Sequence, residues 1–238
     1  MSKSAKKLIF GIPSKGRLKE QCETWLAAKG LVLQQVGGSR GYKAKLNNFP
    51  NIEVRLLSAS EIAKSLLTGD IHLGISGEDI VCELSDRTDA LIEFIEKLGF
   101  GNADVVVAVP NGWIDVATMA DLAEVASDLR KSRSHRLRVA TKFTRISAMF
   151  FQKHGVIDYR LVQSDGATEG APANGIAEII VDITTSGSTL VANNLKILDD
   201  GLILASQANL MLAKTAGWSD ANKIECNEFL RQCGFDRT

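Results

Sequence analysis

Residues 179–190 read IIVDITTSGSTL, and this stretch decides the fold prediction. Its apolar, β-branched start predicts a buried strand, which runs into five hydroxyl residues and one glycine and then into a helix. In open α/β sheets, ligands bind where strands end, because the following helix begins with unpaired backbone amides. The stretch therefore predicts an α/β fold with an anion-binding turn at this point.

The residue types in this turn suit a phosphate group. Gly187 permits close approach of the backbone, and the hydroxyls around it add hydrogen-bond donors. These hydroxyl residues are Thr184, Thr185, Ser186, Ser188 and Thr189. No lysine follows Gly187, so the loop is not a Walker A motif. Asp182, at the strand end, is placed to hold a ribose hydroxyl or a metal-bound water. The alternative is an ordinary Ser/Thr helix cap beside an incidental acid.

Two other strand-to-helix turns share this design. Residues 10–18 (FGIPSKGRL) carry Lys15 and Arg17 at a helix start. Cations there oppose the helix dipole by about 0.3–1 kcal/mol each, which suggests a bound anion. The alternative is that both side chains extend into solvent. Residues 70–79 (DIHLGISGED) indicate only a helix start, and we expect His72 to be a packed residue rather than a catalyst.

Strand-like and helical patterns alternate along the whole chain. We expect strands at 8–12, 52–57, 71–75, 105–109, 137–140 and 179–183, and paired strands or a hairpin at 202–205 and 210–213. We expect helices at 18–29, 143–154 and 190–195, and others that begin after Ser58, near residue 77 and after Thr118. Ser58 with Glu61 has the pattern of a capping box. The alternation predicts the α/β class, with parallel or mixed sheets flanked by helices.

The composition excludes several classes of protein. The chain has 28 basic and 28 acidic residues, so its formal net charge is zero, which argues against a general nucleic-acid binder but leaves room for a local phosphate site. Its four cysteines are far apart, which gives no support to a disulfide scaffold or a zinc site. No run approaches the roughly 18 apolar residues of a membrane span. We expect a cytoplasmic protein.

Two basic clusters stand out. Residues 39–45 (SRGYKAK) form a polar loop whose Arg40 and Lys43 are candidates for a polyphosphate. The most basic stretch runs from Arg130 to Arg138 and continues at Lys142 and Arg145. A solvated face is the simpler interpretation of that stretch. A nucleic-acid surface is the alternative, which the zero net charge and the few aromatic residues disfavour.

Several motifs, in one order, resemble the ATP phosphoribosyltransferase family. The most specific are residues 166–172 (GATEGAP), 175–182 (GIAEIIVD) and 185–190 (TSGSTL). Residues 13–18, 74–79, 98–101, 107–110 and 138–142 add to the resemblance. The resemblance implies two lobes like those of type II periplasmic binding proteins, with the active site in the cleft between them. Lobe one would comprise residues 1–100 plus 191–238, and lobe two residues 101–190.

The resemblance also implies a form of the family and a partner. The long form of the family ends in a regulatory domain that binds histidine, and this chain resembles the short form. Short forms work with a regulatory subunit similar to histidyl-tRNA synthetase. We therefore expect a hetero-oligomer with such a subunit, and neither a nucleic-acid nor a membrane partner.

The implied reaction opens histidine biosynthesis. N1 of the adenine of ATP attacks C1 of phosphoribosyl pyrophosphate, and pyrophosphate leaves with Mg²⁺. Residues 184–189 would cradle the 5′-phosphate, while Asp182 and Glu169 would hold ribose hydroxyls or Mg²⁺. Lys15 and Arg17 would face pyrophosphate or the phosphates of ATP, and Arg17 is also a catalytic candidate.

The alternatives are a two-lobed small-molecule-binding domain without catalysis and an ordinary nucleobase phosphoribosyltransferase. The same two-lobed architecture serves binding and catalysis, so fold alone does not decide between them. The motifs around the acidic strand end match the ATP-using family rather than the nucleobase enzymes.

Overall fold

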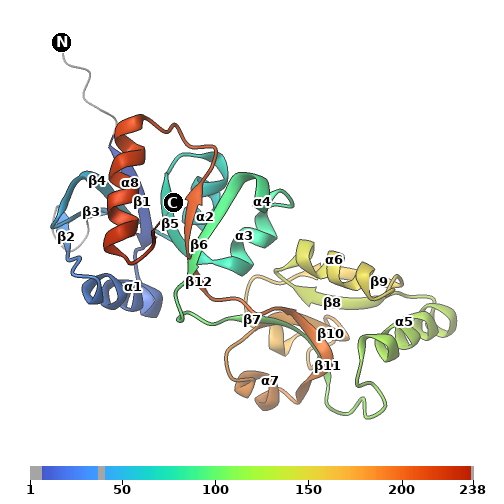
Figure 1. The fold of residues 1–238 in the computed structure, drawn as a ribbon. Helices are drawn as coiled ribbons and strands as arrows, with labels where there is room; N and C mark the ends of the chain where they lie inside the picture. Colours follow the sequence, from blue (N-terminus) through green and yellow to red (C-terminus); the bar gives the residue numbers. More distant parts are fainter. Residues whose placement is uncertain (1–6, 37–40, 237–238) are drawn as a thin grey trace. The chain divides into compact units, whose positions relative to one another are not determined.

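The computed structural model describes residues 7–36 and 41–236 of the chain. They divide into two compact units, unit 1 (Met1–Gly101 with Gln207–Thr238) and unit 2 (Asn102–Ser206). Each unit holds one mixed sheet flanked by helices, which confirms the predicted α/β class (Figure 1). None of the helices in the described part of the chain combines the length and the apolarity needed to cross a bilayer.

Unit 1 is built on a seven-stranded sheet in the order β2-β3-β4-β1-β5-β12-β6. The central strands β4, β1 and β5 run parallel, and the remaining pairs are antiparallel. The strands are β1 (Leu8–Pro13), β2 (Leu33–Val36), β3 (Lys43–Leu46), β4 (Phe49–Leu57), β5 (Leu73–Gly77), β6 (Ile92–Lys97) and β12 (Ala208–Ala213). The helices are α1 (Gly16–Ala28), α2 (Ala59–Thr68), α3 (Glu78–Leu84), α4 (Thr88–Leu91) and α8 (Asp220–Gln232).

Both faces of this sheet are buried. Phe10 and Ile12 of β1 lie in a core shared with α1 and α8, where the rings of Phe10 and Phe229 pack edge to face with centroids 5.2 Å apart. The opposite face carries a second core with α2 and α3. Gly74 of β5 allows α2 to pack closely there, because a Cβ at this position would lie 2.7 Å from Cγ2 of Ile62.

Local sequence signals explain where helices of both units begin and end. Ser58 Oγ accepts a hydrogen bond from Glu61 N, and Glu61 Oε2 accepts one from Ser58 N, which confirms the predicted capping box. Gly69 ends α2 in the left-handed conformation with φ 78°. Thr118 caps α5 in the same way as Ser58 caps α2. His72 is buried and accepts a hydrogen bond from Ile9 N at Nδ1, as expected for a packed residue.

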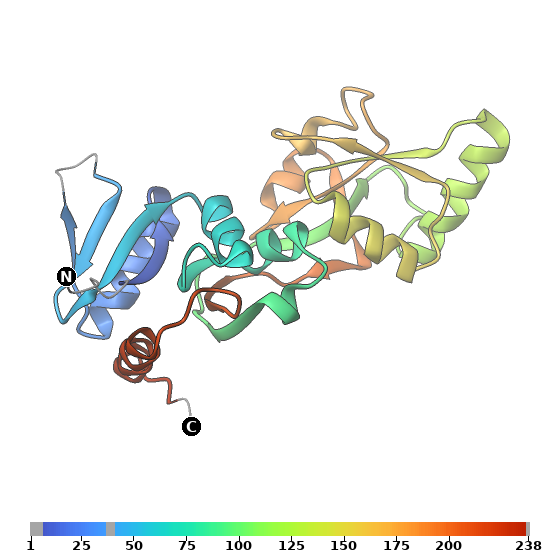
Figure 2. The same cartoon turned by 90° about the horizontal axis from the view of Figure 1, so that it is seen from above.

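Unit 2 is built on a five-stranded sheet in the order β11-β7-β10-β8-β9. Strands β10, β8 and β9 run parallel, and β7 and β11 pair antiparallel. Figure 2 shows α6 and α7 on opposite faces of this sheet. The strands are β7 (Asp104–Pro110), β8 (Leu137–Thr141), β9 (Tyr159–Gln163), β10 (Ile179–Thr184) and β11 (Leu195–Leu204). The helices are α5 (Met119–Arg133), α6 (Thr144–Lys153) and α7 (Ser188–Ala192), with a 3₁₀ turn at Thr168–Gly170.

The C-terminal third of the chain departs from the sequence prediction. The expected hairpin of 202–205 with 210–213 is wrong, because β11 pairs with β7 in unit 2 whereas β12 pairs with β5 and β6 in unit 1. The helix expected at 190–195 is also shorter, since Leu195 already begins β11. Residues 191–206 belong to unit 2, and the lobe boundaries that the resemblance implies stay a prediction. An apolar run predicts a strand but does not indicate which strand it pairs with.

Candidate functional site

The hydroxyl-rich loop lies at the carboxyl end of β10. Gly187 has φ +74°, and a Cβ at this position would meet nothing within 4 Å, so the space above the loop is open. Gly187 N donates a 2.8 Å hydrogen bond to Thr184 Oγ1, which closes the turn. Thr185 Oγ1 donates to the carbonyl oxygen of Asn102 at 3.1 Å. The threonines therefore hold the backbone of the loop, while the glycine keeps its outer side accessible.

The serine hydroxyls of the loop are exposed. Ser186 Oγ and Ser188 Oγ lie 2.9 Å apart, and Ser188 N donates to Ser186 Oγ at 3.4 Å. Thr189 is exposed beside them, on the first turn of α7. Because a hydroxyl hydrogen rotates to suit its partner, these groups can turn from each other toward an oxyanion. The predicted cradle residues are thus brought together in one exposed turn.

Asp182 lies two residues before the end of β10 and is half-buried. Burial raises the pKa of this carboxyl above its ordinary value, and the charge of Glu169 raises it further. Two groups lower the pKa: Ile183 N, which donates to Oδ1 at 2.8 Å, and the positive charge of Lys142. The net pKa shift is upward. The predicted pair Asp182 and Glu169 therefore lies in one electrostatic cluster, together with Lys142.

The topology explains how this cluster forms. β10 and β8 are parallel neighbours in which Ile180 pairs with Ala140, so Asp182 and Lys142 both lie two residues further along. Glu169 lies on the 3₁₀ turn Thr168–Gly170, which contacts β10. Sequence reasoning left Lys142 out of the site. The available signal was a lysine directly after one strand and an acid near the end of its parallel neighbour. This signal can be used only once the order of the strands is known.

The cationic candidates of unit 1 lie at the start of α1 and on β3. Lys15 and Arg17 are exposed, and neither forms an ion pair with a residue that the structure describes. Lys43 is paired with Glu53, with 3.4 Å between Nζ and Oε1. Arg40 lies outside the described residues. Lys15, but not Arg17 or Lys43, lines a cavity of about 460 Å³, whose lining is Ser14, Lys15, Lys19, Gln35, Gly41, Tyr42 and Leu56.

The site offers few ligands for a metal ion. Within residues 7–36 and 41–236, no three His, Cys, Asp or Glu side chains gather closely enough to hold one. Asp182 and Glu169 supply two carboxylates, and oxygen donors of this kind suit Mg²⁺. Mg²⁺ typically binds through one or two carboxylates together with substrate phosphates, so this donor set fits a cation that arrives with a phosphorylated ligand.

Comparison with known proteins places the chain within a family. The family model for ATP phosphoribosyltransferase matches residues 58–232. The ATP phosphoribosyltransferase of Caulobacter vibrioides (strain NA1000 / CB15N) is 55% identical over 212 residues, which cover 89% of this chain and 66% of that protein. That of Rhodopseudomonas palustris (strain BisB18) is 54% identical over 211 residues, covering 89% and 65%. The chain thus spans about two thirds of the length of these curated relatives.

Solved structures share the fold. A chain of the ATP phosphoribosyl transferase (HisG:HisZ) complex from Thermotoga maritima is 22% identical with a TM-score of 0.70, and the match covers 95% of this chain and 96% of that one. The alkanesulfonate-binding protein SsuA from Xanthomonas axonopodis pv. citri is 13% identical with a TM-score of 0.50, covering 96% and 72%. At these identities the likeness concerns the fold, and it agrees with the predicted architecture of the periplasmic-binding-protein type.

Proposed function

We propose that this chain, which belongs to the ATP phosphoribosyltransferase family, joins N1 of the adenine of ATP to C1 of phosphoribosyl pyrophosphate and releases pyrophosphate. This reaction is the first step of histidine biosynthesis. The observation that carries the proposal is the 55% identity to the Caulobacter vibrioides ATP phosphoribosyltransferase over 212 residues. The 58–232 family match contains Asp182 and the hydroxyl-rich loop.

The chemistry makes modest demands on the protein. Adenine N1 has a free lone pair, so the displacement needs no strong base to create the nucleophile. The barrier is lowered by holding the two substrates in line and by stabilising charge on the ribose ring and on the departing pyrophosphate. Donors and acceptors at fixed positions, rather than a nucleophilic side chain, are what the reaction requires.

The loop of residues 184–189 is our proposed cradle for the 5′-phosphate of phosphoribosyl pyrophosphate. The open space above Gly187 admits a phosphate close to the backbone, where amides donate to its oxygens. The exposed hydroxyls of Ser186, Ser188 and Thr189 supply further donors. Thr184 and Thr185 hold the turn in shape through their bonds to Gly187 and Asn102.

Asp182 and Glu169 are our proposed acceptors for the ribose hydroxyls. Their negative charge also stabilises the positive charge that develops on the ring as the bond to pyrophosphate breaks. Lys142 acts on Asp182 by favouring its ionised form, which is a positioning role. Mg²⁺, which we expect to enter with phosphoribosyl pyrophosphate, would neutralise the leaving group, and the two carboxylates are the residues placed to assist in holding it.

Lys15 and Arg17 are our proposed contacts for pyrophosphate or for the phosphates of ATP. Both are exposed at the start of α1, where they oppose the dipole and form no ion pair among the described residues. Lys43 is available to the same phosphates, because an exposed pair such as Lys43 with Glu53 contributes only about 0–1 kcal/mol and is readily exchanged. Arg40 stays a prediction from sequence.

A regulatory subunit similar to histidyl-tRNA synthetase is the partner we propose. The family resemblance implies it, and the Thermotoga maritima relative that shares the fold was solved as a complex of two different proteins. We expect this partner to change turnover rather than to supply the loop of residues 184–189, which lies entirely within unit 2.

The decisive experiment is a product assay. The protein is incubated with ATP, phosphoribosyl pyrophosphate and Mg²⁺, with and without the proposed regulatory subunit, and phosphoribosyl-ATP is measured. We expect product in at least the mixture that contains both proteins. Absence of product from both mixtures would overturn the proposal. Calorimetric binding of phosphoribosyl pyrophosphate without product would then favour the binding-domain alternative.

A further inference from the structure

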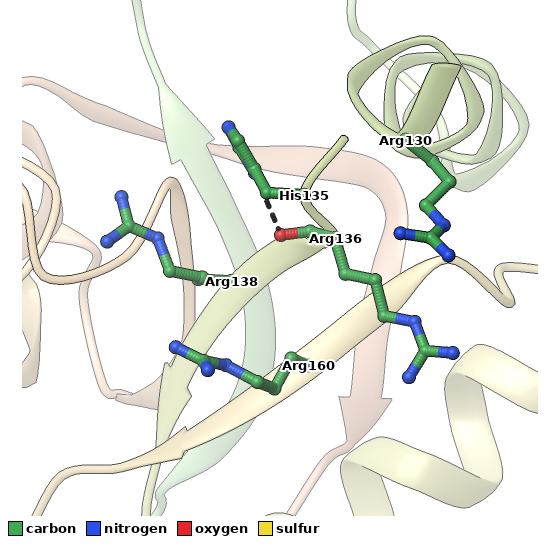
Figure 3. Close-up of a pocket in the computed structure, with 5 residues that line it drawn as sticks. All are labelled: Arg130, His135, Arg136, Arg138 and Arg160. Carbon is green, nitrogen blue, oxygen red and sulfur yellow. Dashed lines mark hydrogen bonds between the residues drawn. The ribbon is translucent and has the colours of Figure 1, made fainter. Parts of the chain in front are cut away.

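A second cationic site lies at the start of β8, in the most basic stretch of the sequence. Four arginines and one histidine line a single cavity of about 310 Å³ (Figure 3). They come from α5, from the turn that follows it, from β8 and from β9. The lining residues are Arg130, His135, Arg136, Arg138 and Arg160, and we call this group the arginine pocket.

The fold brings like charges together in this pocket. Arg138 and Arg160 occupy paired positions on the neighbouring strands β8 and β9, so their side chains leave the same face of the sheet. Like charges directly opposite each other in a sheet are destabilising. Glu178 offsets this repulsion at Arg138, and the proposed transferase chemistry uses none of the pocket residues.

Only part of the charge is balanced by the protein. Glu178 accepts from Arg138 Nη2 at 2.6 Å and from Arg138 N at 2.6 Å, which neutralises this arginine. Among the residues that the structure describes, no acidic side chain forms an ion pair with the other three pocket arginines. Arg130, Arg136 and Arg160, which line one cavity, therefore have no ion-pair partner among the described residues.

The arginine pocket is separate from the candidate phosphoribosyl site. Side chains alternate along a strand, so Arg138 and Ala140 leave β8 on the same face. Arg138 lies at the start of the strand, and Lys142 lies just past its end, in the Asp182 cluster. Four residues of strand span about 13 Å. The two sites thus lie at opposite ends of β8.

We propose that the arginine pocket binds a small anion that carries two or more linked phosphate groups. Three uncompensated guanidinium groups match the charge of such an ion, and each guanidinium offers a planar fork of donors for phosphate oxygens. In Figure 3, the guanidinium groups of Arg130 and Arg136 project to one side and those of Arg138 and Arg160 to the other. Because the two sets point apart, a ligand with several linked phosphate groups suits them better than a single phosphate does.

Two observations favour a small anion over a macromolecule. The three arginines that have no ion-pair partner among the described residues all line one cavity. The chain as a whole has zero net charge, whereas nucleic-acid binding relies on many cationic contacts along a phosphate backbone. Inorganic polyphosphate and the phosphates of a nucleotide share the chemistry that the pocket recognises, and the choice of probes separates them.

The test is calorimetric titration of the full chain with sodium tripolyphosphate in the absence of metal. The pocket variant carries Arg130→Gln, Arg136→Gln and Arg160→Gln. The control variant carries Lys64→Gln, Lys131→Gln and Lys153→Gln, which removes the same number of exposed charges from residues that do not line the pocket. We expect tripolyphosphate to bind the pocket variant at least tenfold more weakly, with less than a twofold change in the control.

Two further measurements complete the test. One distinguishes the arginine pocket from the phosphoribosyl site, and the other distinguishes a nucleotide ligand from an inorganic polyphosphate. Gly187→Ala is expected to leave the pocket's affinity for tripolyphosphate unchanged, so the result does not depend on whether the transferase proposal holds. Inorganic phosphate is expected to bind at least tenfold more weakly than tripolyphosphate. Tighter binding of GDP than of inorganic pyrophosphate would identify a nucleotide, and the reverse would identify an inorganic chain.

A third variant guards against loss of folding. Arg136→Lys with Arg160→Lys keeps every charge but removes two planar forks, and we expect it to bind tripolyphosphate several-fold more weakly than wild type. Equal affinity of wild type, pocket variant and lysine variant would overturn the proposal. The proposal would also be overturned if the wild-type protein did not bind tripolyphosphate but bound duplex DNA or polyglutamate through these arginines.

Discussion

At Asp182, the role that we propose works against the stability of the fold. Burial raises its pKa, while Ile183 N and Lys142 partly restore the charged form. A carboxyl whose pKa is raised in the folded state contributes stability that is present below the unfolded pKa and is lost as pH rises through the folded pKa. At neutral pH, the ionised form of Asp182 therefore destabilises the fold, although the proposed reaction requires that form.

We expect Asp182→Asn to lower turnover on the order of 10²-fold, because it removes charge at the ring where positive charge develops. Its thermal stability at neutral pH should equal or exceed that of wild type. In wild type, turnover should fall as pH drops through the raised pKa of Asp182. Asp199→Asn, an exposed acid on β11, is the control. Unchanged turnover in Asp182→Asn would remove this residue from the mechanism.

Gly187 offers a second test at the residue scale. Gly187→Ala places a methyl group in open space above the loop, where we propose that the phosphate lies. The positive φ costs roughly 1–2 kcal/mol for a residue with a Cβ. Gly155, with φ +71° and nothing within 4 Å, matches that strain after α6. We expect Gly187→Ala to raise KM for phosphoribosyl pyrophosphate on the order of tenfold, and Gly155→Ala to leave KM unchanged at a similar loss of stability.

At the scale of elements, Glu178 and Arg138 join the starts of β10 and β8. Burial raises the pKa of Glu178, but the hydrogen bonds and the charge of Arg138 outweigh burial and hold this pKa below its ordinary value. A lowered pKa contributes stability that is present above the unfolded pKa and is lost as pH falls through the folded pKa. The contact is thus a clamp that weakens in acid.

We expect Glu178→Gln to lower the free energy of unfolding at pH 7 by about 1–3 kcal/mol, since hydrogen bonds to a charged partner contribute in this range. Urea unfolding at several pH values measures the effect. The difference from wild type should shrink below about pH 4, where free Glu is protonated. A difference that stayed constant down to about pH 3 would show that the lost contact is not electrostatic.

His72 joins β1, α8 and the segment before α8 in a comparable way. Its Nδ1 accepts from Ile9 N of β1 at 3.1 Å, its Nε2 lies 3.1 Å from the amide nitrogen of Asn222 on α8, and its ring packs against Trp218. We expect His72→Leu to destabilise unit 1, because each buried polar group that loses its partner costs about 1–3 kcal/mol. Turnover per folded molecule should be nearly unchanged, and a large loss of turnover would speak for a catalytic role instead.

At the scale of the whole molecule, each unit has its own sheet and its own buried core. Hydrogen exchange can therefore test whether the units are separate in energy as well as in topology. We expect Glu178→Gln to accelerate amide exchange in β8 and β10 while leaving β1 and α8 unchanged. His72→Leu should do the reverse. Acceleration across both units by either variant would mean that they open as one cooperative body.

Local patterns in the sequence predicted many of the elements of this structure. The strand and hydroxyl loop at 179–190, the capping box at Ser58 and the alternation of strands and helices depend on contacts within a few residues, so they were readable without a fold. The family resemblance rested on the same short motifs. Strands β2, β3, β6 and β9 escaped prediction, because their mixed polar composition resembles that of loops.

Strand order was decided only by the tertiary structure. Whether β11 joins β7 or β12 depends on long-range pairing, which apolar runs do not encode. The same holds for Lys142 beside Asp182 and for Arg160 opposite Arg138, since each pair is joined only when β8 lies between β10 and β9. The sequence by itself determined the family and the chemical character of one loop. The tertiary structure decided which distant charges meet, because neighbours across a sheet are remote along the chain.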